Sequence, residues 1–173
     1  MTLAEATALI QNNHVGKLNQ PQQWADLGCG SGLFSKALLQ LLPASSVVYA
    51  VDKQAQSFSE KQIHFYQLDV ENDILPFNSV NGILIANALH YVKNKSALIK
   101  KIKKILQPGG SFIIVEYDYM QANRWVPFPV DFISLKALFT SEGFDKVEKI
   151  NERPSLYNRG NMYSAYIYNS NDF

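Results

Sequence analysis

Three aspartates and a glycine-rich loop are the residues whose types and spacing could bind a ligand. The loop runs from Asp26 to Gly32 and has glycine at every second position from 28 to 32. Glycine adopts backbone angles that other residues avoid, so such a loop can turn tightly and let a ligand lie against its backbone. A tight turn that binds nothing would contain the same glycines, so the loop needs support from other residues.

The spacing of the glycines bears on the kind of ligand. The dinucleotide fingerprint G-x-G-x-x-G would place its third glycine where this chain has Leu33. The observed spacing is G-x-G-x-G, which suits a ligand whose amino-acid tail and ribose cross the loop. This spacing and the Pro108–Gly110 turn argue against a nicotinamide (NAD)-dependent oxidoreductase, the alternative enzyme class with a similar strand, loop and acid.

Two further aspartates end the next two apolar runs. Asp52 lies 20 residues after Gly32 and could accept hydrogen bonds from both hydroxyls of a ribose, although a helix-capping aspartate is an alternative. Asp69 could accept from an adenine amino group, although Asp69–Asp73 also fits an ordinary polar loop. Because open α/β sheets bind ligands at the carboxyl ends of parallel strands, the three aspartates together predict one nucleoside-binding edge.

Apolar periodicity predicts the elements that must position these residues. Strand and helix alternate, which predicts a parallel sheet with helices on both faces, and the last two strands should form an antiparallel hairpin. Residues 53–60 leave room for only a stunted helix, and Pro108–Gly110 should end the helix before it. The expected strands span residues 24–27, 47–52, 63–68, 82–86, 111–116, 144–150 and 162–168, and the expected helices 3–13, 33–42, 94–106 and 131–142.

Length, composition and net charge limit the classes of protein to which the chain could belong. With 173 residues, 47% hydrophobic and 18% charged, the chain has the size and balance of one globular domain. A net charge of +1 argues against a broad electrostatic surface for nucleic acid or anionic membrane. One cysteine excludes an intrachain disulfide, and we find neither a secretory leader pattern nor about 20 consecutive apolar residues. We expect a soluble cytoplasmic protein, with no indication of its oligomeric state.

Five segments in this order resemble the motifs of the class I S-adenosylmethionine-dependent methyltransferases, in particular the small bacterial members of the type 11 group. They are Trp24–Gly32, Val51–Asp52, Leu68–Phe77, Asn87–Val92 and Ile105–Gly110, and they lie within residues 20–168. The resemblance implies a Rossmann-like, doubly wound α/β fold with a seven-stranded, mostly parallel sheet, an antiparallel last strand and helices on both faces. It implies one methyltransferase domain over residues 1–173, with a short helical extension in residues 1–20.

The resemblance also implies how S-adenosylmethionine would be bound. Its methionine end would lie against Asp26 and the glycine loop, its ribose against Asp52, its adenine against Asp69, and its sulfonium above Asn87. The implied cofactor-binding residues are Asp26, Gly28, Cys29, Gly30, Gly32, Asp52, Lys53, Asp69, Val70, Asn87 and Ala88. Two departures from the family pattern, the short segment after the second strand and the short N-terminal extension, imply an open adenine side and a thin cover over the substrate.

Three polar residues are candidates for the chemistry itself. Methyl transfer from a sulfonium is an in-line displacement, so an enzyme mainly has to align the reactants and exclude water. A general base is useful only if the acceptor must lose a proton. His90, after the fourth strand, is the best candidate base, and a packing or hydrogen-bonding histidine is the alternative. Glu116 and Asp118 could act as a base or bind a cationic acceptor, or could be solvated loop charges.

An aromatic and proline-rich stretch, Tyr117–Phe132, is expected to wall the acceptor site. The candidates for substrate contacts are Tyr117 and Trp125 of this stretch, together with Tyr91. Aromatic walls favour a flat or cationic organic acceptor. Ordinary core packing is the alternative. The lysines between positions 93 and 104 are expected to form a solvated helix face, and we see no metal-ligand spacing. Arginines that could bind an anionic acceptor group are Arg124, Arg153 and Arg159.

The sequence excludes some classes of methyl acceptor but does not identify the acceptor. Asn87–His90 lacks the prolines of the segment that methylates amino groups of bases or glutamine. Cys29 lies on the glycine loop and is the only cysteine, so carbon-5 methylation of cytosine lacks its nucleophile. We therefore predict methyl transfer to an oxygen, nitrogen or carbon atom of a small molecule. A protein that binds S-adenosylmethionine or S-adenosylhomocysteine without turnover is the alternative from another class.

Overall fold

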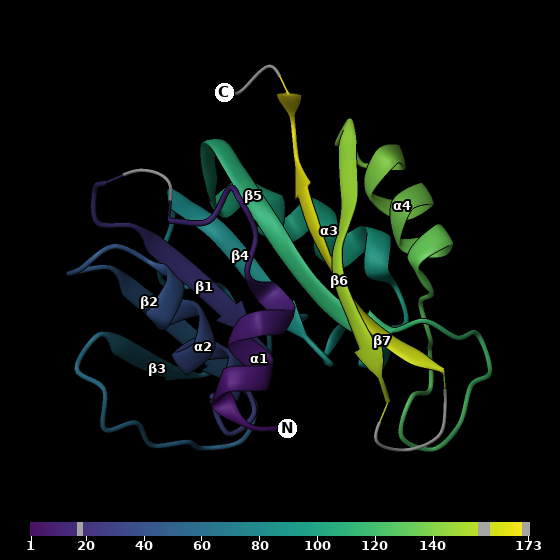
Figure 1. Ribbon diagram of the computed structural model, residues 1–173, viewed down its shortest axis with the longest axis horizontal. Helices are drawn as coiled ribbons and strands as arrows, with labels where there is room; N and C mark the ends of the chain where they lie inside the picture. The colour runs from purple at the N-terminus through teal and green to yellow at the C-terminus, as the bar shows by residue number, and fades with distance from the viewer. Residues whose placement is uncertain (17–18, 156–159, 171–173) are drawn as a thin grey trace.

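The computed structural model describes residues 1–16, 19–155 and 160–170. This part of the chain is built around a seven-stranded sheet in the order β3-β2-β1-β4-β5-β7-β6, flanked by helices (Figure 1). The strands are β1 (Gln23–Leu27), β2 (Val47–Asp52), β3 (Ile63–Gln67), β4 (Val80–Ala86), β5 (Leu106–Tyr117), β6 (Lys146–Pro154) and β7 (Asn161–Tyr168). The helices are α1 (Leu3–Ile10), α2 (Leu33–Leu41), α3 (Lys95–Ile102) and α4 (Phe132–Ser141), with 3-10 turns η1 (Leu89–Tyr91) and η2 (Lys103–Ile105).

The strand order brings the candidate ligand-binding residues to one edge of the sheet. β3, β2, β1, β4 and β5 run parallel, and β7 runs antiparallel to both β5 and β6. The predicted Rossmann-like fold with an antiparallel last strand is therefore confirmed, as is the hairpin of the last two strands. Because parallel strands end at the same edge, Asp26, Asp52 and the segments after β3 and β4 lie along one side of the molecule.

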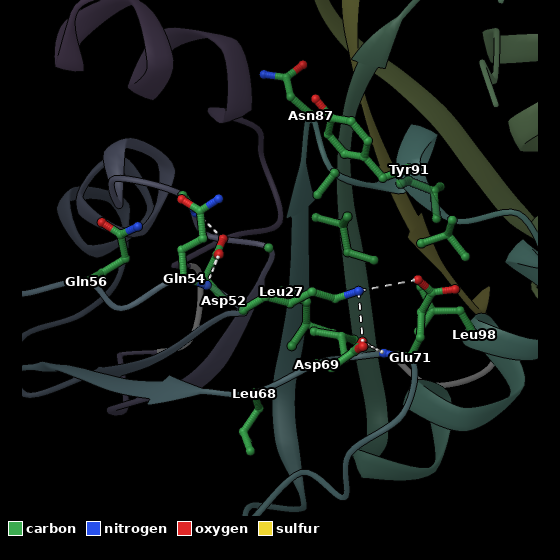
Figure 2. A pocket seen from close by; sticks show the side chains of 18 residues that line it. Leu27, Asp52, Gln54, Gln56, Leu68, Asp69, Glu71, Asn87, Tyr91 and Leu98 are labelled. Carbon is green, nitrogen blue, oxygen red and sulfur yellow. Dashed lines mark hydrogen bonds and ion pairs between the residues drawn. The ribbon is translucent and has the colours of Figure 1, made fainter. Parts of the chain in front are cut away.

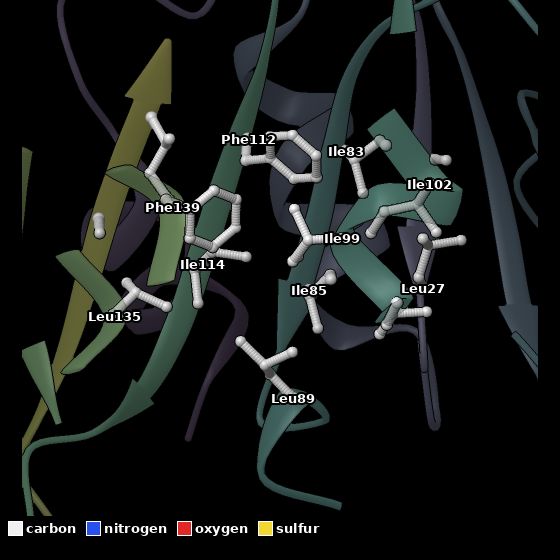
Figure 3. Packing of buried hydrophobic residues seen from close by; sticks show 14 of the residues in the cluster. Leu27, Ile83, Ile85, Leu89, Ile99, Ile102, Phe112, Ile114, Leu135 and Phe139 are labelled. Carbon is white, nitrogen blue, oxygen red and sulfur yellow. The ribbon is translucent and has the colours of Figure 1, made fainter. Parts of the chain in front are cut away.

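Apolar side chains cover both faces of the central strands, as expected for a sheet buried between helices. Along β4, Ile83 and Ile85 point into the layer under α3 and α4, whereas Leu84 points into the layer under α1 and α2. Phe112 and Ile113 of β5 repeat this alternation. Figure 3 shows the first of these layers, with α3 and α4 side chains meeting those of β4 and β5. This packing fixes the strand register on which the site depends.

Side chains cap the first turns of three helices. Asp131 accepts a hydrogen bond from the Ser134 N–H at the start of α4, and Asn94 does the same for the first turn of α3. Thr2 and Glu5 form a capping box on α1, in which each side chain accepts the other residue's backbone N–H. Such caps contribute about 1 kcal/mol each. None of the helices in the described ranges is long and apolar enough to cross a membrane.

The expected helix within residues 53–60 is wrong. The segment between β2 and β3 has no helical turn. Only Ala55 and Phe58 in it are apolar, too few for a stripe that would hold a helix on the sheet. Phe58 instead packs onto the glycine loop, where a Cβ atom at Gly32 would lie 2.0 Å from its ring. The chain therefore crosses between the strands as an irregular segment.

The expected end of the third helix also differs. α3 ends at Ile102 and continues only as the turn η2, so the helix is shorter than residues 94–106. The Pro108–Gly110 turn lies inside β5 and not at the end of a helix. Leu106 already pairs with Val80, and the ladder with β4 resumes after a bulge. A proline and two glycines are tolerated there because a bulge leaves residues unpaired.

Candidate active site

The glycine-rich loop after β1 is held in a left-handed conformation. Gly28, Gly30 and Gly32 have φ angles of 78°, 51° and 80°, a region that favours glycine. The Gly28 N–H donates to the carbonyl oxygen of Val51 at 2.8 Å. A Cβ atom at Gly28 would lie 2.5 Å from the Cβ of Ala88, so glycine lets the loop approach the segment after β4.

Asp52 ties the end of β2 to this loop. Its Oδ2 accepts the Gly30 N–H at 2.9 Å, and its Oδ1 accepts the Gln54 N–H at 2.9 Å. The helix-capping alternative does not hold, because residues 53–62, between β2 and β3, form no helix. The half-buried carboxylate lies in the wall of a cleft and keeps lone pairs for further donors.

The cleft has a volume of about 550 Å³ and lies at the carboxyl ends of β1, β2, β3 and β4. In Figure 2, Asp52 and Gln54 lie on one side, Asp69 and Glu71 on another, and Asn87 and Tyr91 at the far end. The implied cofactor-binding residues that line it are Gly28, Gly30, Asp52, Lys53, Asp69, Val70, Asn87 and Ala88. Three others, Asp26, Cys29 and Gly32, lie outside its lining. Sequence reasoning missed Gln54, Gln56 and Glu71, whose only signal was their closeness to the two aspartates.

Asp26 lies behind the loop and not in the cleft wall. Its side chain is fully buried: Oδ2 accepts from Ser35 Oγ at 2.5 Å, and Oδ1 is shielded and has no hydrogen-bond partner in the described structure. Burial, reinforced by the charge of Asp52, raises the pKa of Asp26 to about 7. Burial also raises the pKa of the Cys29 thiol far above its usual range, which makes it a poor nucleophile. The roles implied for both residues stay predictions.

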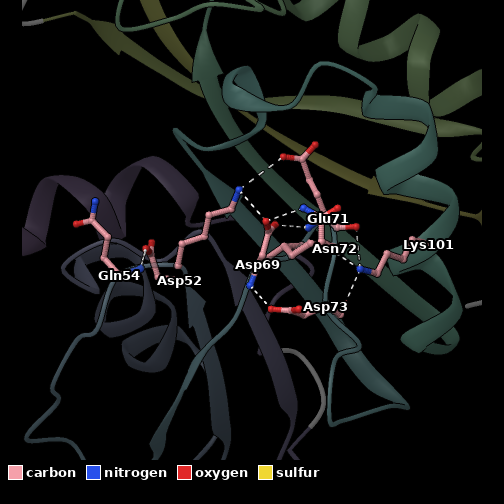
Figure 4. Close-up of polar contacts among 9 residues, drawn as sticks. Asp52, Gln54, Asp69, Glu71, Asn72, Asp73 and Lys101 are labelled. Atoms are coloured by element: carbon pink, nitrogen blue, oxygen red, sulfur yellow. Dashed lines mark hydrogen bonds and ion pairs between the residues drawn. The ribbon is translucent and has the colours of Figure 1, made fainter.

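Charged side chains gather at the end of the cleft next to β3. Lys53 Nζ lies 3.1 Å from Asp69 Oδ2 and 4.0 Å from Glu71 Oε1. Asp69 also accepts from Asn72 Nδ2 at 2.7 Å and from the Glu71 N–H at 2.9 Å (Figure 4). Burial alone would raise the pKa of Asp69, but the hydrogen bonds from Asn72 and Lys53 outweigh it and lower the pKa to about 2. Asp69 is therefore ionised at neutral pH, with most of its lone pairs in use.

Lys101 of α3 anchors the loop that follows Asp69. Its Nζ donates to the carbonyl oxygens of Val70, Glu71 and Asp73 at 2.8, 3.1 and 2.6 Å (Figure 4). The expectation of a solvated lysine face is wrong at this position. Periodicity placed Lys101 on the polar side of α3 correctly, but the carbonyl groups come from a loop 28 to 31 residues away.

An aromatic cavity of about 490 Å³ adjoins the cleft. It is lined by Asn87, His90, Tyr91, Tyr117, Tyr119, Trp125, Val126 and Ser155. The three predicted substrate contacts, Tyr91, Tyr117 and Trp125, all line it. Sequence reasoning missed Ser155, which follows the end of β6 and had no local signal. Asn87 and Tyr91 line both this cavity and the cleft, so the two spaces are adjacent there.

Two contacts fasten the aromatic stretch to the turn η1. The Phe128 N–H donates to the carbonyl oxygen of His90 at 3.0 Å. Lys95 Nζ donates to the carbonyl oxygens of Phe128 and Val92 at 2.7 and 2.9 Å. Desolvation lowers the pKa of Lys95, although the nearby charge of Glu116 opposes that shift. These contacts bridge residues that flank the cavity.

His90 and Glu116 form a buried pair in the structure. Their side chains are 3% and 1% exposed, and His90 Nδ1 lies 2.7 Å from Glu116 Oε2. The His90 backbone N–H donates to the other carboxylate oxygen at 3.1 Å. With an ionised carboxylate, which can only accept, and a neutral imidazole, Nδ1 would carry the proton and Nε2 would keep a lone pair. His90 is thus hydrogen-bonded, as the structural alternative expected, and it also lines the aromatic cavity, as a base must.

Asn87 stands at the junction of the cleft and the aromatic cavity with an unusual backbone. Its φ of 52° is in the left-handed region, which non-glycine residues adopt at a cost. A hydrogen bond of 2.9 Å from its N–H to the Val115 carbonyl oxygen holds it there. Its Oδ1 is shielded from solvent and has no hydrogen-bond partner in the described structure. Strain combined with an unpaired oxygen is typical of a functional position.

The remaining candidates lie away from the two cavities or make structural contacts. Asp118 accepts from the Phe132 N–H and from Lys149 Nζ, both at 2.9 Å, and so fastens the start of α4. The guanidinium of Arg124 lies 5.3 Å from the ring of the next residue. Arg159 falls outside the described residues. Within the described ranges, no group of three or more His, Cys, Asp and Glu side chains could hold a metal ion.

Comparison with solved structures shows the fold. This chain is similar to the 1,6-didemethyltoxoflavin-N1-methyltransferase of Burkholderia thailandensis, solved with 1,6-didemethyltoxoflavin and S-adenosylhomocysteine. The two structures superpose with a TM-score of 0.72 at 17% sequence identity, and the alignment covers 96% of this chain and 77% of that chain. It is also similar to an S-adenosylmethionine-dependent methyltransferase from Aquifex aeolicus, with a TM-score of 0.63 at 14% sequence identity. That alignment covers 96% of this chain and 98% of the Aquifex chain. At these identities the likeness shows the fold, which is that of the class I methyltransferases.

The sequence then shows the family. Residues 25–114, just over half of the chain, match the family model described as a methyltransferase domain. The chain therefore belongs to this methyltransferase family, and the predicted resemblance to class I S-adenosylmethionine-dependent methyltransferases is confirmed.

Two relatives show how much of a longer protein this chain covers. An uncharacterized chloroplastic methyltransferase of Arabidopsis thaliana is 31% identical over 117 residues, which are 60% of this chain and 33% of that protein. A ubiquinone/menaquinone biosynthesis C-methyltransferase of Saccharophagus degradans is 29% identical over 126 residues, 66% of this chain and 50% of that protein. The matched regions thus span about a third to a half of the length of these relatives.

Proposed function

We propose that this chain transfers the methyl group of S-adenosylmethionine to a small organic acceptor bound in the aromatic cavity. The observation that carries the proposal is the junction of two cavities at Asn87 and Tyr91. A donor in the cleft and an acceptor in the aromatic cavity would meet there, which is the alignment that an in-line displacement needs. When bound, S-adenosylmethionine supplies an activated methyl group on its sulfonium.

The cleft fits this cofactor in size and chemistry. Its volume of about 550 Å³ falls in the usual range of small-molecule sites. Asp52, with lone pairs still free, would hold the ribose hydroxyls. Asp69 and Val70 would contact the adenine, and the glycine loop would lie along the methionine arm.

The buried His90–Glu116 pair favours an acceptor that loses a proton. Nε2 of His90 would take that proton from an oxygen, nitrogen or carbon atom of the acceptor. Glu116 would hold the imidazole in the required tautomer and balance the charge of the imidazolium. The aromatic lining favours a flat acceptor, whose ring could lie against Tyr117 or Trp125.

The experiment that tests this proposal is labelling of a small-molecule acceptor. The protein is incubated with methyl-labelled S-adenosylmethionine and a protein-free metabolite extract, beside the Glu116→Gln variant. We expect a labelled small molecule with the wild type and a rate about 10²- to 10⁴-fold lower with the variant. Labelling at the same rate with both proteins would contradict the role of the pair.

The alternatives predict different results in the same experiment. A protein that binds S-adenosylhomocysteine tightly and labels no acceptor from any extract would be a binding protein without turnover. A protein that binds NAD and not S-adenosylhomocysteine would be an oxidoreductase. Either result would replace the proposed function.

A further inference from the structure

Arg153, near the end of β6, has a guanidinium nitrogen that the fold leaves unsatisfied. Its Nη2 lies 3.1 Å from Glu5 Oε1 of α1. Its Nη1 is shielded from solvent and has no hydrogen-bond partner in the described structure. Buried donors are nearly always paired in folded proteins, because an unpaired one costs stability. A bound ligand is one way to supply the missing acceptor.

Glu5 satisfies only part of this guanidinium. Its Oε2 accepts the Thr2 N–H at 2.7 Å in the capping box of α1, which leaves Oε1 for Nη2 of Arg153. The hydrogen bond from Thr2 and the pairing with Arg153 lower the pKa of Glu5 to about 2, so Glu5 is ionised at neutral pH. It neutralises one edge of Arg153, and the edge that carries Nη1 is left without an anion.

Arg153 lines a small third cavity of about 170 Å³. Among the described residues that line this cavity, Arg153 has the only charged side chain. The apolar wall consists of Met1, Leu33, Phe34, Pro154 and Met162. The volume equals that of roughly five or six water molecules, enough for a carboxylate group and a few carbon atoms. A guanidinium group beside an apolar wall is an arrangement that favours a small organic anion.

The third cavity adjoins the candidate active site. It shares Asn87, Tyr117 and Ser155 with the aromatic cavity, and Asn87 with the cofactor cleft. A molecule in either larger space could therefore extend one end toward Arg153.

We infer that Arg153 binds a carboxylate group of a molecule in the active site, an inference that rests on the proposed function. The planar guanidinium matches a carboxylate in geometry and charge. The carboxylate has two possible sources: the amino-acid arm of the cofactor, or an acidic acceptor. In both cases Arg153 is a binding residue from outside the glycine loop and the carboxyl ends of β1 to β4.

Calorimetry with matched ligands tests the first source. S-Adenosylhomocysteine has the amino-acid arm, and 5′-methylthioadenosine lacks it. If the cofactor supplies the carboxylate, Arg153→Gln weakens S-adenosylhomocysteine binding about 10- to 100-fold and leaves 5′-methylthioadenosine binding unchanged. Arg153→Lys should recover part of the loss, because it keeps the charge without the fork.

Aromatic acids test the second source. Benzoate and its neutral analogue benzamide are titrated into the protein with and without saturating S-adenosylhomocysteine. If an acidic acceptor is the source, Arg153→Gln abolishes benzoate binding, keeps S-adenosylhomocysteine binding and leaves any benzamide binding unchanged. The inference would be overturned if the Arg153→Gln variant bound S-adenosylhomocysteine, 5′-methylthioadenosine, benzoate and benzamide as the wild type does.

Two control variants separate ligand binding from a structural role. Glu5→Gln breaks the ion pair with Arg153 and should keep or strengthen carboxylate binding. If Glu5→Gln weakens binding as much as Arg153→Gln, Arg153 only joins α1 to β6 and the inference fails. Lys146→Gln removes the same charge from an exposed position of β6 and should change nothing. A wild type that binds neither adenosyl ligand would refute the proposed function, and the benzoate titration without cofactor would still decide the role of Arg153.

Discussion

His90 and Glu116, 26 residues apart in the sequence, face each other with Nδ1 and Oε2 separated by 2.7 Å. The pairing of Ala86 with Val115 in the ladder of β4 and β5 produces this contact, because it places the turn after β4 beside the end of β5. The second oxygen of Glu116 accepts the His90 backbone N–H, so the carboxylate is held at both oxygens. The orientation of the imidazole follows from the strand register.

Glu116→Gln should reduce turnover without weakening cofactor binding. The glutamine can keep accepting the His90 N–H, but its amide would donate to Nδ1 and move the imidazole proton to Nε2. His90 would then be unable to accept a proton, and we expect a rate about 10²- to 10⁴-fold lower. Single-turnover methylation and calorimetry with S-adenosylhomocysteine measure the two effects separately.

Asp118→Asn is the matched control for this prediction. Asp118 lies two residues beyond Glu116 and was also considered as a base from the sequence, but its oxygens accept from the Phe132 N–H and Lys149 Nζ. We expect this variant to be less stable and to keep its turnover rate at a temperature where it is folded. A loss of rate as large as that of Glu116→Gln would contradict the assignment of the base.

Lys101→Met should weaken cofactor binding although Lys101 touches no cofactor in our account. Without the ammonium group, the carbonyl groups of Val70, Glu71 and Asp73 lose their shared donor and the loop beside Asp69 loosens. We expect about a 3- to 10-fold rise in the Kd for S-adenosylhomocysteine, or ~0.7–1.4 kcal/mol. Calorimetry measures the change, and Lys104→Met, from the exposed end of the same helical region, should leave Kd unchanged.

The raised pKa of Asp26 predicts how the free energy of unfolding depends on pH. Burial raises the pKa of the folded-state carboxyl to about 7 from an ordinary 3.8. Between about pH 4 and 7 the unfolded chain therefore loses this proton while the folded chain keeps it, so the free energy of unfolding falls as the pH rises. The fall attributable to this group is up to about 4 kcal/mol and levels off above pH 7.

Asp26→Asn should remove this pH dependence. Asparagine can still accept the hydrogen bond from Ser35 Oγ and has no carboxyl to titrate. Urea unfolding from pH 4 to 8 should show wild-type stability falling relative to the variant as the pH rises. Parallel curves for the two proteins would show that Asp26 ionises normally in the fold.

The sequence predicted the parts of the site that depend on local chain chemistry. The glycine spacing and the acids that end two strands identified Asp52 and Asp69, because the end of a parallel strand is a fixed place in such a fold. The aromatic residues Tyr91, Tyr117 and Trp125, which line the aromatic cavity, were also candidates, from the segment after β4 and the aromatic stretch after β5. The expected helix within residues 53–60 failed because available length alone does not make a helix without an apolar stripe.

Contacts made by tertiary packing could not be predicted in this way. Lys101 has the same local pattern as the exposed Lys93 and Lys104, and only the fold brings three carbonyl groups to its Nζ. His90 and Glu116 were both candidates, but their pairing depends on the register of β4 and β5. The charge of Arg153 was visible, whereas its shielded Nη1 and its small cavity were not.

We propose above all that the cleft at Asp52 binds the adenosyl cofactor. Titration calorimetry with S-adenosylhomocysteine, repeated with NAD and with the Asp52→Asn variant, tests it most directly. We predict saturable heat with S-adenosylhomocysteine, none with NAD, and affinity at least about tenfold lower in the variant, because two ribose hydroxyls lose a charged acceptor. No heat with S-adenosylhomocysteine, or equal affinity in wild type and variant, would contradict the account.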